Sequence, residues 1–202
     1  MRPSPKTDAL VAVDTALRPT GFVRRGHVWL QERGDGVSGW LGFGRVGEVD
    51  LTPLVGVRFQ RYDEVCRALG FGIPTMPMVS TPLGALMPEK PVWHWNFAPG
   101  GDHASVASAL VATFLKHGKP YIDKHAKWDA LSRELVAKPE SLLDFERARK
   151  LAIIHVLNGN VGAAGEVLKK ERERVADSRD VYARSYRAFA HRFELSFMRS
   201  LG

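Results

Sequence analysis

The residues whose spacing comes closest to a known chemistry form a glycine-rich segment. Gly42-Phe43-Gly44-Arg45-Val46-Gly47 has the glycine spacing of a protein-kinase loop, whose backbone amides close over phosphates. Neither a His-Arg-Asp triplet nor an Asp-Phe-Gly triplet follows it, and Asp144-Phe145-Glu146 lacks the glycine. A strand pattern follows where a dinucleotide fingerprint needs a helix. We therefore expect these glycines to accommodate a bulge or bend in a sheet.

The histidines are the next candidates for acid–base or metal chemistry. None of the seven forms a His-x-x-x-His pair, and the single Cys66 cannot build a cysteine zinc site. His94, Asp102 and His103 could meet near a strand end, which leaves an enzyme with a dispersed, unrecognised site as one alternative. Because no catalytic constellation is complete, we expect a non-enzymatic protein with no catalytic residue, no metal and no cofactor.

Arginines close to aromatic residues suggest a second alternative, a nucleic-acid-binding accessory domain. Such a domain would use the following basic residues: Arg24, Arg25, Arg184, Arg187 and His191. Their positive charges could contact phosphates while aromatic rings stack on bases. In the last helix, however, the aromatic residues lie on the side opposite the basic ones, a pattern typical of a core-facing stripe and a solvated side.

The net charge bears on the choice of partner. The chain of 202 residues has 29 Lys and Arg against 22 Asp and Glu, a formal charge of +7. The excess is spread along the sequence, which favours solubility and is weak support for a specific nucleic-acid site. If binding is electrostatically steered, the partner is expected to be an acidic protein.

A proline- and methionine-rich stretch at residues 71–91 is the candidate contact surface. Its five prolines are incompatible with a helix or a central strand, so we expect a long loop with one edge strand. Two interpretations stay open: a connector with its apolar side chains tucked into the core, or an adaptable surface for a protein partner. The second would use the following residues: Met76, Met78, Val79, Leu83 and Met87.

The elements that must position these residues follow from hydrophobic periodicity. A helix is expected over residues 5–18, then strands at 27–32, 40–46, 51–59 and 92–97, with a short helix ending at Gly70. From residue 102 onward about five helices are expected, Asp102 and Ser141 being N-caps. Tyr182, Tyr186, Phe189, Phe193 and Phe197 form one stripe of the last helix.

The order of these features resembles that of an uncharacterised bacterial domain family. The resemblance covers the N-terminal two-thirds and depends on Leu17-Arg18-Pro19-Thr20-Gly21-Phe22, Arg24-Arg25-Gly26, Leu54-Val55-Gly56-Val57 and Val92-Trp93. It implies an α+β fold and carries no catalytic residues. By analogy, small bacterial domains of this kind often look like accessory or immunity proteins of toxin systems. Residues 151–168 resemble one tetratricopeptide-type helical hairpin.

Together these patterns predict one α+β domain over residues 1–202. Residues 1–98 are expected to form a helix and an antiparallel β-meander, and residues 99–202 a helical bundle packed on it. The N-terminus has no signal-peptide pattern, no stretch is apolar enough to span a membrane, and a lone cysteine suits a reducing cytoplasm. The leading hypothesis is a cytoplasmic protein-binding domain, and the specific form considered is an immunity-type inhibitor of a bacterial toxin.

Overall fold

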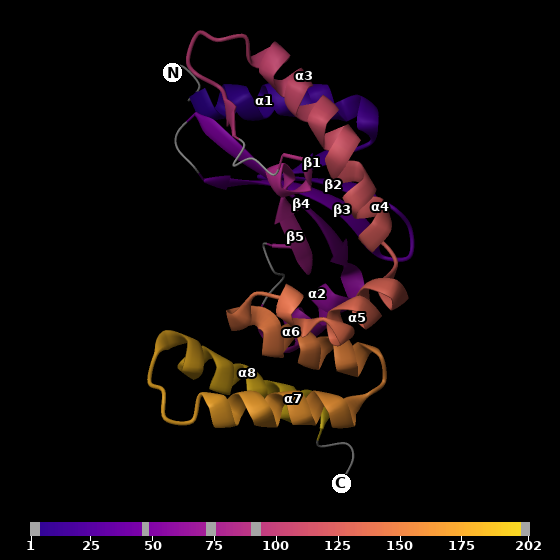
Figure 1. Cartoon of the computed structure of the whole chain (residues 1–202), viewed down its shortest axis with the longest axis vertical. Coiled ribbons are helices and arrows are strands. Elements are labelled where there is room, and N and C mark those ends of the chain that lie inside the picture. The colour runs from indigo at the N-terminus through magenta and orange to yellow at the C-terminus, as the bar shows by residue number, and fades with distance from the viewer. Residues whose placement is uncertain (1–4, 46–48, 72–75, 90–93, 199–202) are drawn as a thin grey trace. The chain divides into compact units, whose positions relative to one another are not determined.

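The computed structural model describes residues 5–45, 49–71, 76–89 and 94–198, and it confirms an α+β fold (Figure 1). The chain divides into two compact units. Unit 1 comprises residues 1–59 and 76–126, and unit 2 comprises residues 60–75 and 127–202. This division differs from the expected one at residues 98 and 99, because the helices of residues 103–125 pack on the sheet. The prediction of one domain over the whole chain stays a prediction.

Unit 1 is an antiparallel sheet with helices on one face. Its helices are α1 (Pro5–Leu17), α3 (His103–Thr113) and α4 (Lys119–His125). Its strands are β1 (Val23–Arg25), β2 (Val28–Glu32), β3 (Val37–Arg45), β4 (Asp50–Phe59), β5 (Val79–Pro82) and β6 (Trp95–Asn96). The strand order is β1-β2-β3-β4-β5, and β6 also pairs with β4. The expected meander is thus present, extended by β1, which the sequence patterns did not reveal.

The alternation of apolar residues in β4 fixes which face of the sheet is buried. Leu51, Pro53, Val55, Val57 and Phe59 are buried, whereas the residues that alternate with them, except Gly56, are only partly covered. On the same face Trp29 donates a hydrogen bond from Nε1 to Asp14 Oδ1 of α1, at 2.9 Å. This face therefore holds the core of unit 1, and α1, α3 and α4 cover it (Figure 1).

The turn between β2 and β3 is formed by Gly34-Asp35-Gly36, a sequence typical of a β-hairpin. Gly34, Asp35 and Gly36 all have positive φ angles, of 83°, 50° and 68°. The amide of Val37 donates to the carbonyl of Gly34, and the amide of Arg33 donates to the carbonyl of Val37. Glycine tolerates this left-handed backbone, so the sequence Gly-Asp-Gly fixes the register of the two strands.

Residues 103–125 form a nearly continuous helix with one irregular turn. Asp102 caps α3 as predicted, its side chain accepting from the amide of Ser105. Between α3 and α4 lies a π-helical turn, Phe114–Gly118. A Cβ on Gly118 would come within 2.6 Å of the Phe114 ring and 3.1 Å of Val55. The glycine therefore lets the helix approach β4 closely at this turn.

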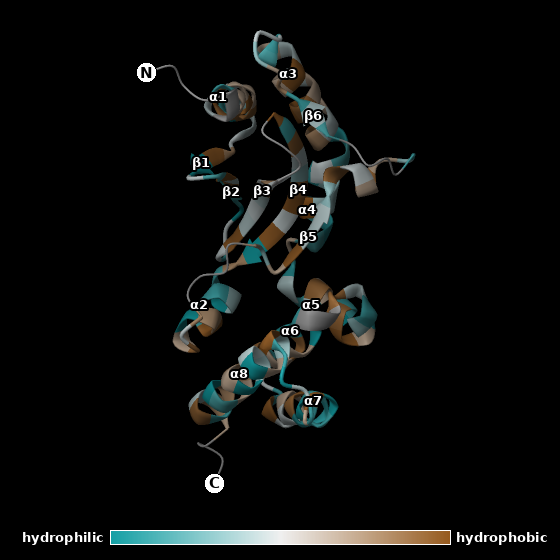
Figure 2. Cartoon of the chain, turned by 90° about the vertical axis from the view of Figure 1, so that its left-hand side faces the viewer, coloured by the Kyte–Doolittle hydropathy of each residue, from teal (hydrophilic) through white to brown (hydrophobic). Residues whose placement is uncertain are grey.

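Unit 2 is entirely helical in the residues that the structure describes. Its helices are α2 (Gln60–Ala68), α5 (Trp128–Ala137), α6 (Asp144–Leu157), α7 (Val161–Arg174) and α8 (Val181–Phe197). α6 packs against the other four helices, and the Asn158-Gly159-Asn160 break joins it to α7 in a helical hairpin. In Figure 2, α7 is hydrophilic on one side and hydrophobic on the other.

The aromatic stripe of α8 is confirmed as a core feature. Tyr186, Phe189 and Phe193 are buried, and successive rings from Tyr182 to Phe197 lie 5.1 to 6.1 Å apart.

The prediction that Ser141 is the N-cap of α6 was wrong. Ser141 donates its hydroxyl to the carbonyl of Lys138 in a short 3₁₀ turn, and α6 begins three residues later at Asp144.

Candidate functional site

The structure places most of the proline- and methionine-rich stretch in the core of unit 1. Met78, Val79 and Leu83 are buried, with exposed fractions of 1%, 9% and 0%. They are buried because residues 79–82 form β5 on β4, as the expected edge strand. Met76 is 41% exposed and Met87 is half-buried. The five residues therefore do not form one exposed surface in this conformation. This arrangement is the one expected of a connector whose apolar side chains are tucked into the core.

The glycine-rich segment has a packing role. The pairing of β3 with β4 is unbroken from Val37–Phe59 to Arg45–Leu51, so the described residues contain no bulge. A glycine is needed at position 42 because the Trp40 ring lies over it. A Cβ on Gly42 would lie 2.2 Å from Trp40 Cη2. Residues 46–48, the end of the motif, lie outside the described part of the chain.

The histidine and aspartate group expected to form a dispersed site has separate partners. His94 Nε2 lies 4.0 Å from Asp50 Oδ1, and His103 Nε2 donates to the carbonyl of Ala98 at 2.9 Å. Asp102 caps α3. Among the residues described, no group of three or more His, Cys, Asp or Glu side chains could hold a metal ion.

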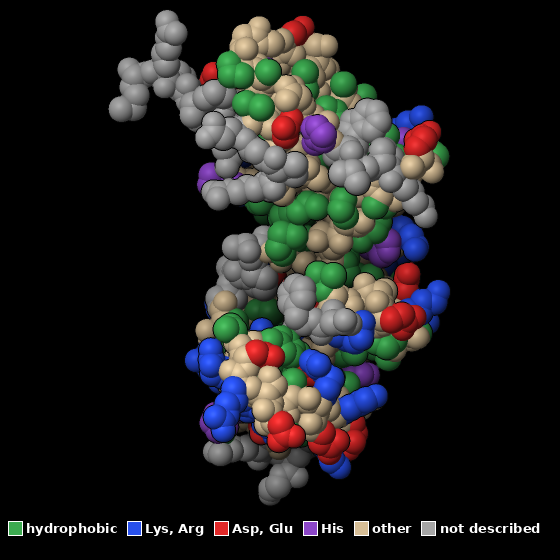
Figure 3. All heavy atoms as spheres, turned by 60° about the vertical axis from the view of Figure 1, so that its left-hand side comes forward, with side chains coloured by type: hydrophobic (Ala, Val, Ile, Leu, Met, Phe, Trp, Pro, Cys, Tyr) green, Lys and Arg blue, Asp and Glu red, His purple; other side chains and the backbone are tan. Residues whose placement is uncertain are grey.

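The five basic residues of the nucleic-acid alternative belong to different units. Arg24 and Arg25 are in β1 of unit 1, and Arg24 lies over the Trp29 ring, 5.5 Å from its centroid. Arg184, Arg187 and His191 are in α8 of unit 2. On the face drawn in Figure 3, Lys and Arg side chains of unit 2 are interspersed with Asp and Glu, so this face has no stripe of one sign.

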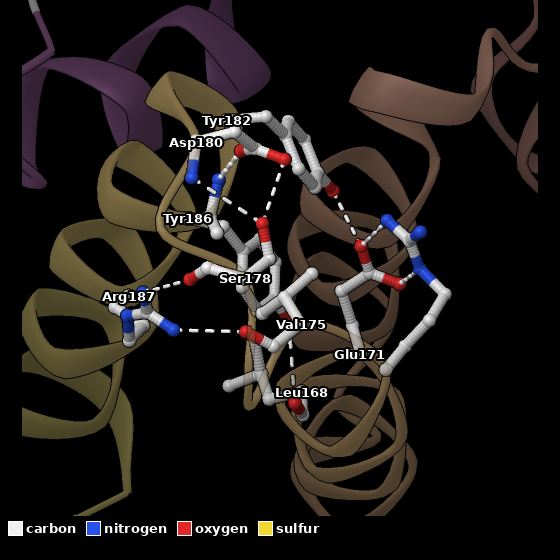
Figure 4. A network of polar contacts seen from close by, with 10 residues as sticks. Leu168, Glu171, Val175, Ser178, Asp180, Tyr182, Tyr186 and Arg187 are labelled. Carbon is white, nitrogen blue, oxygen red and sulfur yellow. Dashed lines mark hydrogen bonds and ion pairs between the residues drawn. The ribbon is translucent and has the colours of Figure 1, made fainter.

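Arg187 has a structural role at the end of α7 (Figure 4). Its guanidinium donates to the carbonyls of Val175, at 2.9 Å, and Ser178, at 2.6 Å. These carbonyls belong to the connection between α7 and α8, where Asp180 caps α8 by accepting from the amide of Ala183. A guanidinium held in this way satisfies carbonyls that have no helical partner, and both of its Nη atoms are already used within the chain.

Glu171 anchors the other half of this network. Its carboxylate accepts two hydrogen bonds from Arg174, at 2.8 and 2.5 Å, and one from the Tyr182 hydroxyl at 2.6 Å (Figure 4). Burial opposes ionisation, but these hydrogen bonds outweigh it and lower the pKa of Glu171. Burial and the hydrogen bond to Glu171 raise the pKa of Tyr182 to about 12. The network stabilises the α7–α8 hairpin and leaves no group poised for acid–base chemistry near neutral pH.

The lone cysteine is in a similarly unreactive setting. Cys66 is buried in α2, on the same helix as the buried Tyr62. Burial raises the pKa of the Cys66 thiol to about 11, so the nucleophilic thiolate is scarce at neutral pH.

The feature of unit 2 best suited to contact another molecule is a shallow depression where α2 ends beside α8. It is lined by Ala68, Leu69, Gly70, Arg192, Leu195 and Ser196. Two apolar side chains here are exposed, Phe71 at 41% and the lining residue Leu195 at 40%. Exposed apolar side chains beside a hollowed surface are typical of a contact site.

The end of α2 determines the shape of this depression. Gly70 has a φ angle of 75°, its amide donates to the carbonyl of Arg67, and the amide of Phe71 donates to the carbonyl of Cys66. This pattern is a Schellman motif, which requires a left-handed residue at the position after the helix. A Cβ on Gly70 would lie 2.8 Å from Arg192 Nη1, so the glycine also leaves room for the guanidinium in its present position.

Arg192 is fixed in the depression from two sides. Its Nη1 donates to the carbonyls of Leu69, at 3.1 Å, and Gly70, at 3.2 Å. Its guanidinium also lies over the Phe71 ring, 5.2 Å from the centroid. Nε and Nη2 have no hydrogen-bond acceptor within the described ranges, so part of the fork stays available to a ligand.

The sequence patterns did not single out this depression. They predicted that a helix ends at Gly70 and placed Arg184, Arg187 and His191 on the solvated side of the last helix, but they passed over Arg192 and Leu195. The available signal was the helical spacing of Leu195, an apolar residue four positions after His191 and eleven after Arg184, which puts it on the same side of α8.

No protein-family model, no curated protein and no solved structure matches this chain. The resemblance to a bacterial domain family and to a tetratricopeptide hairpin therefore stays a prediction. No helix in the described ranges is both long enough and apolar enough to cross a membrane.

Proposed function

We propose that this protein is a non-enzymatic binding domain for an acidic protein, acting in the cytoplasm. The observation that carries the proposal is the depression of unit 2, where the exposed Phe71 and Leu195 flank the fixed guanidinium of Arg192. An apolar contact beside a pre-positioned positive charge is the usual composition of a protein-binding surface.

The preference for an acidic partner has two supports. The chain has a formal charge of +7, which accelerates encounters with negatively charged surfaces. Among the described residues that line the depression, the charged side chain is that of Arg192, which is also positive. An inhibitor of the immunity type, which neutralises a bacterial toxin by covering it, is the specific form of this function that we propose.

Site-specific photo-crosslinking tests the proposal. A photoreactive residue replaces Leu195 in one variant and Val181 in a control variant, since Val181 is exposed on the same helix but does not line the depression. We expect an acidic protein to be crosslinked in native lysate from position 195 and not from position 181. Recovery of the same proteins from both positions would contradict the proposal.

The immunity-type form makes a further demand on the crosslinked partner. Its gene should stop cell growth when expressed alone, and co-expression of this protein should restore growth. A partner that is harmless alone would refute the immunity role and leave the binding function in place.

A further inference from the structure

We propose that the depression recognises a short acidic segment whose carboxylate binds Arg192 and whose neighbouring apolar side chain packs on Phe71 and Leu195. This inference rests on the proposed function and specifies the motif that the partner presents. It follows from the hydrogen-bonding groups that remain unused in the lining, and from the way in which Arg192 is held.

The polar side chains available in the lining can donate hydrogen bonds. The carbonyls of Leu69 and Gly70 already accept from Arg192, so they offer little to a ligand. Among the side chains of the lining, the rest of the Arg192 fork and the hydroxyl of Ser196 have no hydrogen-bond partner in the described residues, and both can donate. Donors beside a positive charge are complementary to a carboxylate, which accepts two parallel hydrogen bonds from a guanidinium.

Because its position is fixed, Arg192 should bind a carboxylate more tightly than an ordinary surface arginine does. A free arginine loses side-chain entropy when it pairs, which is why exposed ion pairs contribute little. Here two carbonyls and the Phe71 ring hold the guanidinium before any ligand arrives. Much of that entropy has therefore been lost on folding, and a larger share of the pairing energy remains for the ligand.

The apolar part of the motif is set by Phe71 and Leu195. Phe71 packs against the buried Phe189 at 5.7 Å between ring centroids, yet 41% of its surface stays open. Because the same ring lies under Arg192, an apolar side chain covering it would exclude water from the ion pair. Removing water strengthens a charge-assisted hydrogen bond.

The test uses the full chain, labelled with ¹⁵N, and short peptides of alternating glutamate and leucine or alternating lysine and leucine. We expect the glutamate peptide to shift the amides of residues 68–71 and 192–196, and the lysine peptide to leave them unchanged. Inorganic phosphate is titrated in parallel. If phosphate at the same concentration gives the same shifts, the depression is a general anion site and the motif is refuted.

Two pairs of variants assign the contacts. Arg192→Gln removes a charge-assisted hydrogen bond, and Leu195→Glu replaces an apolar contact by a charge that repels the carboxylate of the peptide. Each should weaken peptide binding by about tenfold or more. The matched controls, Arg184→Gln and Val181→Glu, change exposed residues of α8 outside the depression and should bind as the parent does. Equal weakening by Leu195→Glu and Val181→Glu would overturn the proposal.

Two further outcomes are decisive. Because Arg192 also caps α2, Arg192→Gln could fail to fold; circular dichroism detects this, and Leu195→Glu then decides alone. If the glutamate peptide shifts no amide of the depression, the motif is wrong. The proposed function survives that result if position 195 still crosslinks an acidic protein, so the two failures are distinguishable.

Discussion

Replacing Gly42 by alanine should destabilise unit 1, while the same change at Gly44 should not. The added Cβ at Gly42 would lie 2.2 Å from Cη2 and 2.4 Å from Cζ2 of Trp40. Carbon atoms prefer separations of about 3.5–4.0 Å, so the ring must move by more than about 1 Å. Trp40 is only 2% exposed and has little room to move. At Gly44 the nearest atom, the Thr52 carbonyl oxygen, is 3.8 Å away, an ordinary contact.

The difference between the two variants isolates the steric cost. Both substitutions restrict the unfolded chain equally, a gain of about 0.4–1 kcal/mol in stability that cancels in the comparison. Forcing a side chain into a filled core costs about 1–3 kcal/mol. Gly42→Ala should therefore be less stable than Gly44→Ala by about 1–3 kcal/mol, or roughly 2–4 °C in Tm per kcal/mol for a chain of this size.

Urea denaturation followed by tryptophan fluorescence measures this difference, since four of the five tryptophans belong to unit 1. A double-mutant cycle identifies the cause: when Trp40 is replaced by leucine, the cost of Gly42→Ala should largely disappear. Equal midpoints for the two alanine variants, or an undiminished cost in the leucine background, would refute the packing role of Gly42.

Three further predictions concern unit 2. Asp180→Ala removes the cap of α8 and should lower the Tm in thermal unfolding, whereas Asp177→Ala should have little effect. Folding lowers the pKa of Glu171, so its contribution is present above the unfolded value of about 4.3 and is lost as pH falls through the folded pKa. Glu171→Gln should thus be less stable than the parent at pH 7, and the gap should close in acid; a gap independent of pH would contradict this. Because burial raises the pKa of Cys66 to about 11, iodoacetamide should label it slowly at pH 8 and quickly in urea. Rapid labelling of the folded chain would show that α2 opens readily.

Local patterns predicted the elements of this fold well. The alternation in β4 gave its buried face, the Gly-Asp-Gly hairpin gave a register, and the aromatic stripe of α8 gave its core side. Each of these features depends on residues only a few positions apart, and such spacing can be read without the structure.

The candidate depression could not be predicted in the same way. Arg192 caps the carbonyl of Leu69, which lies 123 residues earlier in the sequence. No periodicity links two such positions, because their contact depends on how α2 and α8 pack around α6. The role of Gly42 was missed for a related reason: glycine spacing alone does not distinguish a backbone that closes over phosphate from one that makes room for a tryptophan ring.

The path of the chain between the units has a consequence for how the protein can be divided. α2 separates β4 from β5 in the sequence, yet it packs on α6 and belongs with the C-terminal helices. A fragment ending at residue 126 would carry α2 without the helices that cover it, and a fragment starting at residue 127 would leave part of α6 bare. During synthesis α2 leaves the ribosome well before α6, α7 and α8, so it must wait for them with its apolar side uncovered. To produce the sheet unit alone, Phe59 must therefore be joined to Met76 by a new peptide link. To produce the helical unit alone, the segment that contains α2 must be joined to Lys127.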